Sequence, residues 1–340
     1  MVQPKEKILV VGPAWVGDMV MAQSLFKTLH EKNPHPHIDV LAPRWSLPLL
    51  RRMPEVDQAM EIPIGHGQLS WNARLRLGKR LRSERYSQAI IIPRSWKSAL
   101  TPFWAKIPIR TGYIGEFRHI LLNDVRSLDT DVLGTTVERY TALGLSCQAA
   151  MPPRIKYPQL QMDPDHGRFL LRKFDMDTQQ PIAGLMPGAE FGPAKQWPAS
   201  HFAHLVKKLN DEGWQVCILG SPKDFSTGEE IRTISHGRAI NLCGQTSLED
   251  AVDLLAHTSV AVTNDSGLMH IAASVGSKVV AIFGSSSPDY TPPLTSQAVI
   301  LKTEIQCRPC FQRQCHLDHY RCLKEIEPRH VLSAIHNLCR

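Results

Sequence analysis

The turn Asn264–Gly267 has the residues of an anion-binding site. An apolar stretch that suits a buried strand ends there, and a helical pattern follows at once. Such a turn presents free backbone N–H groups and the positive end of a helix dipole, and Gly267 lets a ligand come close. Asp265 and Ser266 can hold a ligand hydroxyl, and His270, one turn further on, can face the same ligand. The alternatives are a helix cap at Asp265 or Ser266 and a packed, structural His270.

Two further loops carry residues suited to a phosphate or a sugar. The loop 187–198 is rich in Gly and Pro and contains one cation, Lys195, although the Walker pattern is missing. The loop 284–288 has a glycine followed by serines, of which Ser286 and Ser287 can offer hydroxyl and N–H groups. The alternatives are a solvated lysine and a flexible connection. Together with the Asn264–Gly267 turn, these loops predict a site for an anionic ligand in the second half of the chain.

Asp18 is the candidate for proton transfer. It ends the segment Gly12–Asp18, between a predicted strand at 7–11 and a predicted helix at 19–29. The dipole of a helix favours a carboxylate at its start, so Asp18 should be ionised and able to accept a proton. The glycines of this segment do not have the spacing of a dinucleotide fingerprint. A capping aspartate without chemistry is the alternative.

Alternating strands and helices predict an α/β fold with two doubly wound parallel sheets. The expected strands are 7–11, 37–41, 58–62, 89–92 and 109–112 in the first half, and 181–186, 215–219, 239–242, 259–263 and 278–283 in the second. The proline-rich stretch 149–161 suits a connection between two domains. Ligands of such sheets bind at the carboxyl ends of the strands, so we expect the site in a cleft between the domains.

The net charge of +7 over 340 residues indicates an acidic partner. The predicted helix 69–86 is rich in arginine, so an anionic acceptor or an anionic membrane surface would explain the charge, and a solvated helix face is the alternative. We find no nucleic-acid module, no apolar run of membrane-spanning length and no export signal. Eight cysteines are too few for a disulfide scaffold, so we expect a cytoplasmic protein with mostly reduced thiols.

Four cysteines near the end of the chain form the pattern Cys-x2-Cys-x4-Cys-x6-Cys. They are Cys307, Cys310, Cys315 and Cys322. Cys-x2-Cys is a good half-site for zinc, but the remaining spacing matches no regular zinc or iron–sulfur pattern. We therefore assign no metal site in the sequence. Three states of this cluster remain open: bound metal, disulfides or free thiols.

Six segments in order resemble the ADP-heptose–lipopolysaccharide heptosyltransferases of glycosyltransferase family 9. They are KILVVGPAWVGDMVMAQSL, IIPRSWKSAL, RTGYIGEFRHILLNDVR, LMPGAEFGPAKQWP, NDSGLMHIAA and FGSSSPDYTPPL. The resemblance runs over nearly the whole chain. Two residues depart from the family pattern, Arg94 in place of an asparagine and Ile114 in place of an arginine, and both concern the acceptor side.

The resemblance implies a GT-B fold of two Rossmann-like domains with parallel sheets facing a central cleft. Residues 1–160 would bind the acceptor, residues 161–325 would bind ADP-heptose, and the helix 326–340 would pack back on the first domain. It further implies transfer of L-glycero-D-manno-heptose, with inversion and without metal or cofactor, to the first heptose of the Kdo2-lipid A inner core. Weak peripheral contact with the inner membrane is expected, and no nucleic acid.

The resemblance also implies roles for individual residues. Asp18 would deprotonate the acceptor hydroxyl, and Lys195 would neutralise the charge on departing ADP. Asp265 would hold the donor heptose. The further donor-binding residues would be Ser266, Gly267, His270, Ser286 and Ser287, and the acceptor would contact Ser95 and Lys97.

Three alternatives to this function remain at this stage. One is another member of the same family that acts on a different acceptor. The second is a sugar-nucleotide epimerase on a similar fold, which would need no acceptor. The third is a non-enzymatic protein that binds a nucleotide sugar or a metal.

Overall fold

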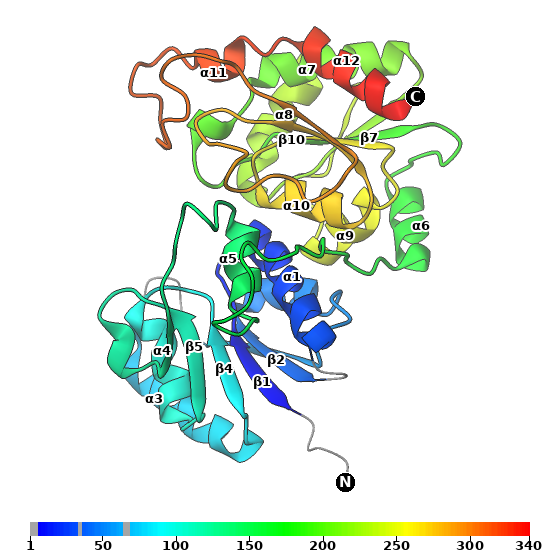
Figure 1. Cartoon of the computed structure of the whole chain (residues 1–340). Coiled ribbons are helices and arrows are strands. Elements are labelled where there is room, and N and C mark those ends of the chain that lie inside the picture. The colour runs from blue at the N-terminus through cyan, green and yellow to red at the C-terminus, as the bar shows by residue number, and fades with distance from the viewer. Residues whose placement is uncertain (1–5, 33–35, 64–68) are drawn as a thin grey trace. The chain divides into compact units, whose positions relative to one another are not determined.

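The computed structural model describes residues 6–32, 36–63 and 69–340, which belong to two compact units, Met1–Pro158 and Gln159–Arg340 (Figure 1). Each unit has a six-stranded sheet whose strands are all parallel, as the alternating pattern predicted. No helix in the described residues is long and apolar enough to cross a membrane.

The first unit has the strand order β3-β2-β1-β4-β5-β6. Its strands are β1 (Lys7–Val11), β2 (His37–Ala42), β3 (Gln58–Glu61), β4 (Gln88–Ile91), β5 (Ile109–Tyr113) and β6 (Asp124–Arg126). Its α-helices are α1 (Val16–Lys32), α2 (Leu47–Leu50), α3 (Trp71–Leu81), α4 (Trp96–Trp104) and α5 (Thr136–Ala142), with 3-10 turns η1 (Arg44–Ser46), η2 (Arg82–Glu84) and η3 (Arg118–Ile120). Because the order reverses between β1 and β4, the chain leaves these two neighbouring strands towards opposite faces of the sheet, and room for a ligand remains between the loops.

The second unit repeats this topology, with the order β12-β11-β10-β7-β8-β9. Its strands are β7 (Ile182–Met186), β8 (Gln215–Ile218), β9 (Ile240–Asn241), β10 (Val260–Asn264), β11 (Lys278–Ile282) and β12 (Ala298–Leu301). Its helices are α6 (Pro164–Lys173), α7 (Ala199–Asp211), α8 (Phe225–Ile234), α9 (Leu248–Leu255), α10 (Gly267–Ser274), α11 (Arg321–Lys324) and α12 (Pro328–Cys339), with η4 (Pro193–Lys195) and η5 (Pro222–Asp224). The order reverses between β7 and β10, so the loops after these two strands are neighbours.

The core of the second unit forms between the sheet and α7. All five residues of β10 are buried, as expected for a central parallel strand covered on both faces. Helix α7 buries Phe202, Val206 and Leu209, which share one helix face at the spacing i, i+4, i+7. Helix α12 packs against α7 and the neighbouring strands (Figure 1). The predicted packing of the 326–340 segment on the first domain, like the predicted domain limits, stays a prediction.

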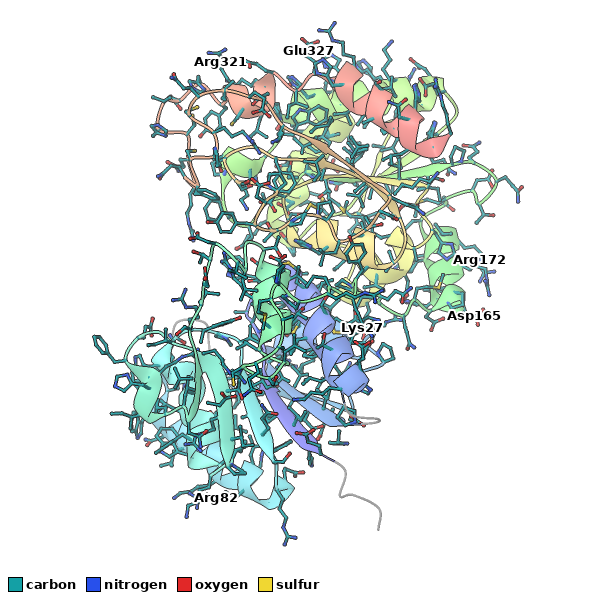
Figure 2. The ribbon with its side chains drawn as sticks, viewed as in Figure 1. Lys27, Arg82, Asp165, Arg172, Arg321 and Glu327 are labelled. Atoms are coloured by element: carbon teal, nitrogen blue, oxygen red, sulfur yellow. The ribbon has the colours of Figure 1, made fainter. Side chains whose placement is uncertain are left out.

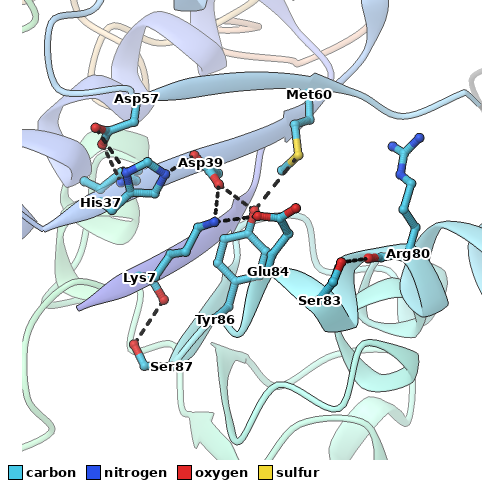
Figure 3. Close-up of polar contacts among 11 residues, drawn as sticks. Lys7, His37, Asp39, Asp57, Met60, Arg80, Ser83, Glu84, Tyr86 and Ser87 are labelled. Atoms are coloured by element: carbon cyan, nitrogen blue, oxygen red, sulfur yellow. Dashed lines mark hydrogen bonds and ion pairs between the residues drawn. The ribbon is translucent and has the colours of Figure 1, made fainter. Parts of the chain in front are cut away.

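A polar cluster around the buried side chains of Asp39 and Tyr86 lies where β1 and β2 begin (Figure 3). The hydroxyl of Tyr86 donates to Asp39 Oδ2 over 2.5 Å, and Lys7 Nζ lies 3.7 Å from the same oxygen and 2.6 Å from Glu84 Oε2. His37 Nε2 lies 3.0 Å from Asp39 Oδ1. Burial, and then the hydrogen bond to Asp39, raise the pKa of Tyr86, so its hydroxyl remains a donor. The cluster is at the opposite end of the sheet from the carboxyl ends, so we assign it to stability.

The predicted elements differ from the structure mainly at the edges of the sheets. We predicted neither of the edge strands β6 and β12, which have three and four residues. Strand β6 has the sequence Asp-Val-Arg and no apolar run, whereas β12 is a short apolar run, Ala-Val-Ile-Leu, that we overlooked. The basic helix expected over 69–86 is the shorter α3 followed by η2. Helix α5 starts at Thr136 rather than at 132, because Thr135 and Glu138 form a capping box.

Candidate functional site

A pocket of about 560 Å³ opens at the carboxyl ends of β1, β4 and β5 in the first unit. Its lining comes from the loop after β1, the loop after β4 and the start of α5. Four cations and one carboxylate are among the lining residues: Arg74, Arg94, Lys97, Arg139 and Asp18. The pocket therefore suits an anionic ligand that carries a group able to lose a proton.

Asp18 lies in the first turn of α1, where the dipole of a 17-residue helix favours its negative charge. Its carboxylate is hydrogen-bonded to Tyr140 of α5, which also lines the pocket. Burial, followed by the charge of Asp18 and this hydrogen bond, raises the pKa of Tyr140 far above its usual range. Tyr140 thus remains a hydroxyl donor that orients Asp18. We did not predict a role for Tyr140. It lies 122 positions after Asp18 in the chain, so no local sequence pattern links the two residues.

Ser95 and Lys97 both line this pocket, at the start of α4. Ser95 is the N-cap residue, and its side chain makes no capping hydrogen bond. Of the two residues that depart from the family pattern, Arg94 lines the pocket and Ile114 is exposed after β5. Their contact with an acceptor stays a prediction.

Arg118 holds the loop that carries Ser95. Its guanidinium is buried and donates to the carbonyl oxygens of Tyr113 and Pro93 and, over 3.2 Å, to Ser98 Oγ. Burial, and then the charge of Arg94, lower the pKa of Arg118 to about 10, so it stays charged at neutral pH. We infer that Arg118 positions the pocket wall, although the sequence pattern alone did not single it out.

Three predicted residues of the second unit meet at one point. Lys195 Nζ lies 2.5 Å from Asp265 Oδ2, and the hydroxyl of Ser286 donates to the same oxygen over 2.6 Å. The side chains of Lys195 and Asp265 are 16% and 6% exposed, so the pair is largely shielded from water. The loops after β7, β10 and β11 therefore converge, as the sequence predicted. The cation and the carboxylate can bind a phosphate and a hydroxyl side by side.

Two residues that we did not predict hold these loops in place. Asn264, at the end of β10, donates through Nδ2 to the Pro187 carbonyl over 2.6 Å and accepts from the Trp197 backbone N–H over 3.0 Å. It thereby fixes both ends of the loop that carries Lys195. Arg308 donates to the carbonyl oxygens of Gly284 and Ser286, which sets the position of the serine loop.

The turn before α10 does not use a side chain as a cap. Ser266 is the N-cap residue, but its side chain makes no capping hydrogen bond and lies 3.3 Å from Thr263 Oγ1. Asp265 is engaged with Lys195 and Ser286, so the capping alternative for these two residues is not supported. Gly267 starts the helix. The hydroxyl of Ser287 donates to Asp289 Oδ2 over 2.8 Å, and its contact with a donor stays a prediction.

His270 is buried behind this turn and should make the protein sensitive to acid. Burial, with a smaller contribution from Lys195, lowers its pKa to about 4 against the opposing effect of Asp265. The unfolded chain binds this proton near pH 6.5, so stability should fall as the pH drops below 6.5, with the loss complete near pH 4. The free energy of unfolding should fall by about 3 kcal/mol for this reason. The variant His270→Gln should not show this contribution when urea unfolding is measured at pH 7.5 and 4.5. Equal pH dependence of both proteins would contradict this.

The four clustered cysteines line a cavity of about 10 Å³, together with Arg308, His316 and His319. All four are free thiols. Burial, followed by the charges of the other three, raises the pKa of Cys322 to about 11. Within residues 6–32, 36–63 and 69–340, no three His, Cys, Asp or Glu side chains are arranged to hold a metal ion. The state of these thiols in solution stays a prediction.

The chain has two Rossmann-like units, one with a cationic pocket and one with a lysine–carboxylate site. This combination is that of a two-domain transferase of activated sugars, and a comparison of sequences identifies its family. The model of glycosyltransferase family 9 (heptosyltransferase) matches residues 74–321. The chain belongs to this family.

Within this family, the chain is similar over almost its whole length to heptosyltransferases of one kind. The chain is 45% identical to lipopolysaccharide heptosyltransferase 2 of Salmonella typhimurium and to that of Escherichia coli, over 98% of this chain and of each relative. It also matches the solved structure of the E. coli ADP-heptose lps heptosyltransferase II, with 43% identity, a TM-score of 0.87 and 98% coverage of both chains. The GT-B fold expected from the sequence is thereby confirmed.

Proposed function

We propose that this enzyme transfers L-glycero-D-manno-heptose from ADP-heptose to the first heptose of the Kdo2-lipid A inner core, in lipopolysaccharide core biosynthesis. The observation that carries the proposal is the 45% identity to lipopolysaccharide heptosyltransferase 2 over essentially the whole chain. The reaction is a glycosyl transfer, so the enzyme must hold a sugar donor and a hydroxyl acceptor at once.

We assign the donor to the second unit. Lys195, largely shielded from water, would bind the diphosphate of ADP-heptose, and Asp265 would hold hydroxyl groups of the heptose. The N–H groups at the start of α10 would add to the binding of negative charge. Ser286 shares Asp265 Oδ2 with Lys195 and would orient that carboxylate. Ser266, Gly267, His270 and Ser287 are the further donor-side candidates.

We assign the acceptor to the pocket of the first unit. The carboxylate groups of an acidic inner-core sugar would meet the cationic lining of this pocket, with Ser95 and Lys97 among the contacts. The acceptor hydroxyl would lie next to Asp18. Tyr140, which donates to Asp18, would keep the carboxylate turned towards the acceptor.

In the proposed reaction, Asp18 takes the proton of the acceptor hydroxyl as its oxygen attacks the anomeric carbon of the heptose. The bond to the diphosphate breaks on the opposite face, so the configuration inverts and ADP leaves with the electron pair. Lys195 neutralises the charge that develops on the diphosphate, and we propose no metal or other cofactor for this step. The eight free cysteines suit a reducing compartment, so we place the reaction in the cytoplasm.

Acceptor exchange tests the proposal. ADP release from ADP-heptose is measured with Kdo2-lipid A, with its mono-heptosylated form, and with a core already extended by two heptoses. We expect turnover only with the mono-heptosylated acceptor. Turnover with one of the other two would assign the enzyme to heptosyltransferase I or III. Epimerised sugar formed without any acceptor would indicate an epimerase.

A further inference from the structure

One sulfur of the four-cysteine cluster, that of Cys315, lies inside a turn of the backbone. The N–H groups of the four residues 317–320 all form hydrogen bonds with this sulfur. Within the turn, Asp318 and Tyr320 have φ values of 55° and 49°, so left-handed residues alternate with ordinary ones. An alternation of this kind directs successive N–H groups to one side and makes a concave site for negative charge. The turn therefore suits a thiolate better than a neutral thiol.

Cys315 combines this thiolate character with access from solution. Burial raises the pKa of its thiol, but the backbone hydrogen bonds together lower it below the ordinary value of a cysteine. The side chain is partly exposed. In Cys322 of the same cluster, burial raises the pKa, so this thiol stays protonated. A partly exposed sulfur with thiolate character is the kind that reacts with disulfides, so Cys315 is the reactive member of the cluster.

His319 holds the turn in this conformation. Its Nδ1 accepts the backbone N–H of Arg321, the residue at the start of α11 that is labelled in Figure 2, over 3.0 Å. The same Nδ1 lies 4.0 Å from Cys315 Sγ, and Nε2 lies 4.0 Å from Cys307 Sγ. The imidazole thus connects the turn to a helix and to a second cysteine, so the N–H groups around Cys315 are fixed before any reaction.

The residues just before Cys315 support the loops of the lysine–carboxylate site. The Ala194 N–H donates to the Arg313 carbonyl over 3.1 Å, and the Phe311 N–H donates to the Ser285 carbonyl over 2.8 Å. Ala194 and Ser285 also line the cavity of the cysteine cluster. One of these residues precedes Lys195 and the other precedes Ser286. The segment 311–315 therefore holds both loops in position.

The same segment reaches Lys195 through an aromatic ring. The guanidinium of Arg313 lies 5.3 Å from the centroid of the Phe191 ring, and Lys195 Nζ lies 4.8 Å from it. Both cations are attracted by the ring, which keeps Lys195 close to this segment. A displacement of Arg313 would therefore change the surroundings of the cation that we assign to the donor diphosphate.

We propose that Cys315 is a redox-sensitive modification site, which exchanges with low-molecular-weight disulfides such as glutathione disulfide and thereby weakens donor binding. The Cys315 thiolate attacks one sulfur of glutathione disulfide, and the bond between the two glutathione sulfurs breaks. One glutathione remains on Cys315 as a mixed disulfide. The other leaves as a thiolate and takes up the proton that Cys315 had lost. Cys315 is thus oxidised and one glutathione is reduced.

The effect on the donor follows from the size of the attached group. The cavity of the cluster holds only about 10 Å³, so a bound tripeptide cannot enter it. Residues 311–315 must then move, and their hydrogen bonds to the two loops are lost. The modification itself is independent of the proposed function. Only the weaker donor binding rests on it, because it assumes that the donor lies at Lys195.

The order in which the thiols react tests the modification site. The reduced full-length protein is treated with substoichiometric glutathione disulfide, the remaining thiols are alkylated, and the modified cysteines are identified by peptide mass spectrometry. We expect Cys315 to react about tenfold faster than Cys147, the exposed cysteine of the first unit. Faster reaction of Cys147, as exposure alone would give, would overturn the proposal. Protection of Cys315 by one tightly bound zinc ion per chain would also overturn it, in favour of a metal site.

Calorimetric titration with ADP tests the link to the donor site. The protein modified at Cys315 should bind ADP about tenfold more weakly, and dithiothreitol should restore the affinity. This comparison needs no substitution. In addition, Cys315→Ser should bind ADP like the wild type and stay insensitive to glutathione disulfide. The matched control Cys147→Ser should lose affinity on treatment as the wild type does.

Two results of the titration have different meanings. Unchanged ADP affinity of the protein modified at Cys315 would show that the modification does not reach the donor site, and the proposal would fail. Absence of ADP binding by the reduced wild-type protein would instead contradict the proposed function. The order of thiol reaction would still decide whether Cys315 is the modification site.

Discussion

Asp18→Asn should lower the rate of heptose transfer by about 10²- to 10⁴-fold, the range typical of a lost general base. The amide is nearly the same size as the carboxylate and can still accept the hydrogen bond from Tyr140, so the pocket should keep its shape. It cannot take a proton from the acceptor hydroxyl at neutral pH. ADP release from saturating ADP-heptose and acceptor measures the rate, and calorimetric titration with ADP measures nucleotide binding, which should be unchanged.

Asp165→Asn is the matched control for this substitution. Asp165 also lies in the first turn of a helix, α6, but it is exposed and belongs to the second unit (Figure 2). The control therefore removes the same charge from the first turn of a helix without touching the pocket, and its activity should equal that of the wild type. Transfer by Asp18→Asn at close to the wild-type rate would show that Asp18 is not the base.

Lys195→Met should reduce kcat/KM for ADP-heptose by about 10²- to 10³-fold, as expected when one preorganised donor to a developing charge is removed. Methionine fills a similar volume but carries no charge, so the diphosphate would lose its cation. The substitution also leaves Asp265, 6% exposed, with Ser286 but without its ion-pair partner, so some stability should be lost. Initial rates over a range of donor concentrations and urea unfolding measure the two effects separately.

Two controls separate binding from stability in this case. Lys223→Met breaks an exposed ion pair with Glu190 that is also 2.5 Å long, and it should change neither quantity appreciably. The double variant K195M/D265N removes both charges, so it should regain stability but not donor binding. A Lys195→Met enzyme with reduced stability and wild-type kcat and KM would contradict the donor role and leave a purely structural ion pair.

The sequence was informative wherever the signal is local. The apolar runs at 7–11 and 278–283 predicted strands correctly to within a residue, because a buried parallel strand is a continuous apolar run. The predicted site residues lie in the loops after strands or in the first turns of helices, and such positions can be identified without knowledge of the fold. The short edge strand β6, with the sequence Asp-Val-Arg, has no comparable pattern.

The convergence of Lys195, Asp265 and Ser286 was also predictable, for a topological reason. Strands that alternate with helices pair in parallel, so all their carboxyl ends lie at one edge of the sheet and the loops after them become neighbours. The residue types then indicate an anionic ligand. The alternation therefore predicts both the architecture and the place of the site before any distance is known.

Only the tertiary structure revealed the residues that hold the site groups in place. Tyr140 meets Asp18, Arg118 reaches the carbonyl of Pro93, and Asn264 bridges the loop that carries Lys195. The sequence alone determined the class of fold, and it predicted at which edge of each sheet a ligand would bind and of what kind, because these depend on local hydrophobic periodicity and on residue type. The supporting contacts depend on side chains brought together from distant parts of the chain, whose direction and burial are set by packing.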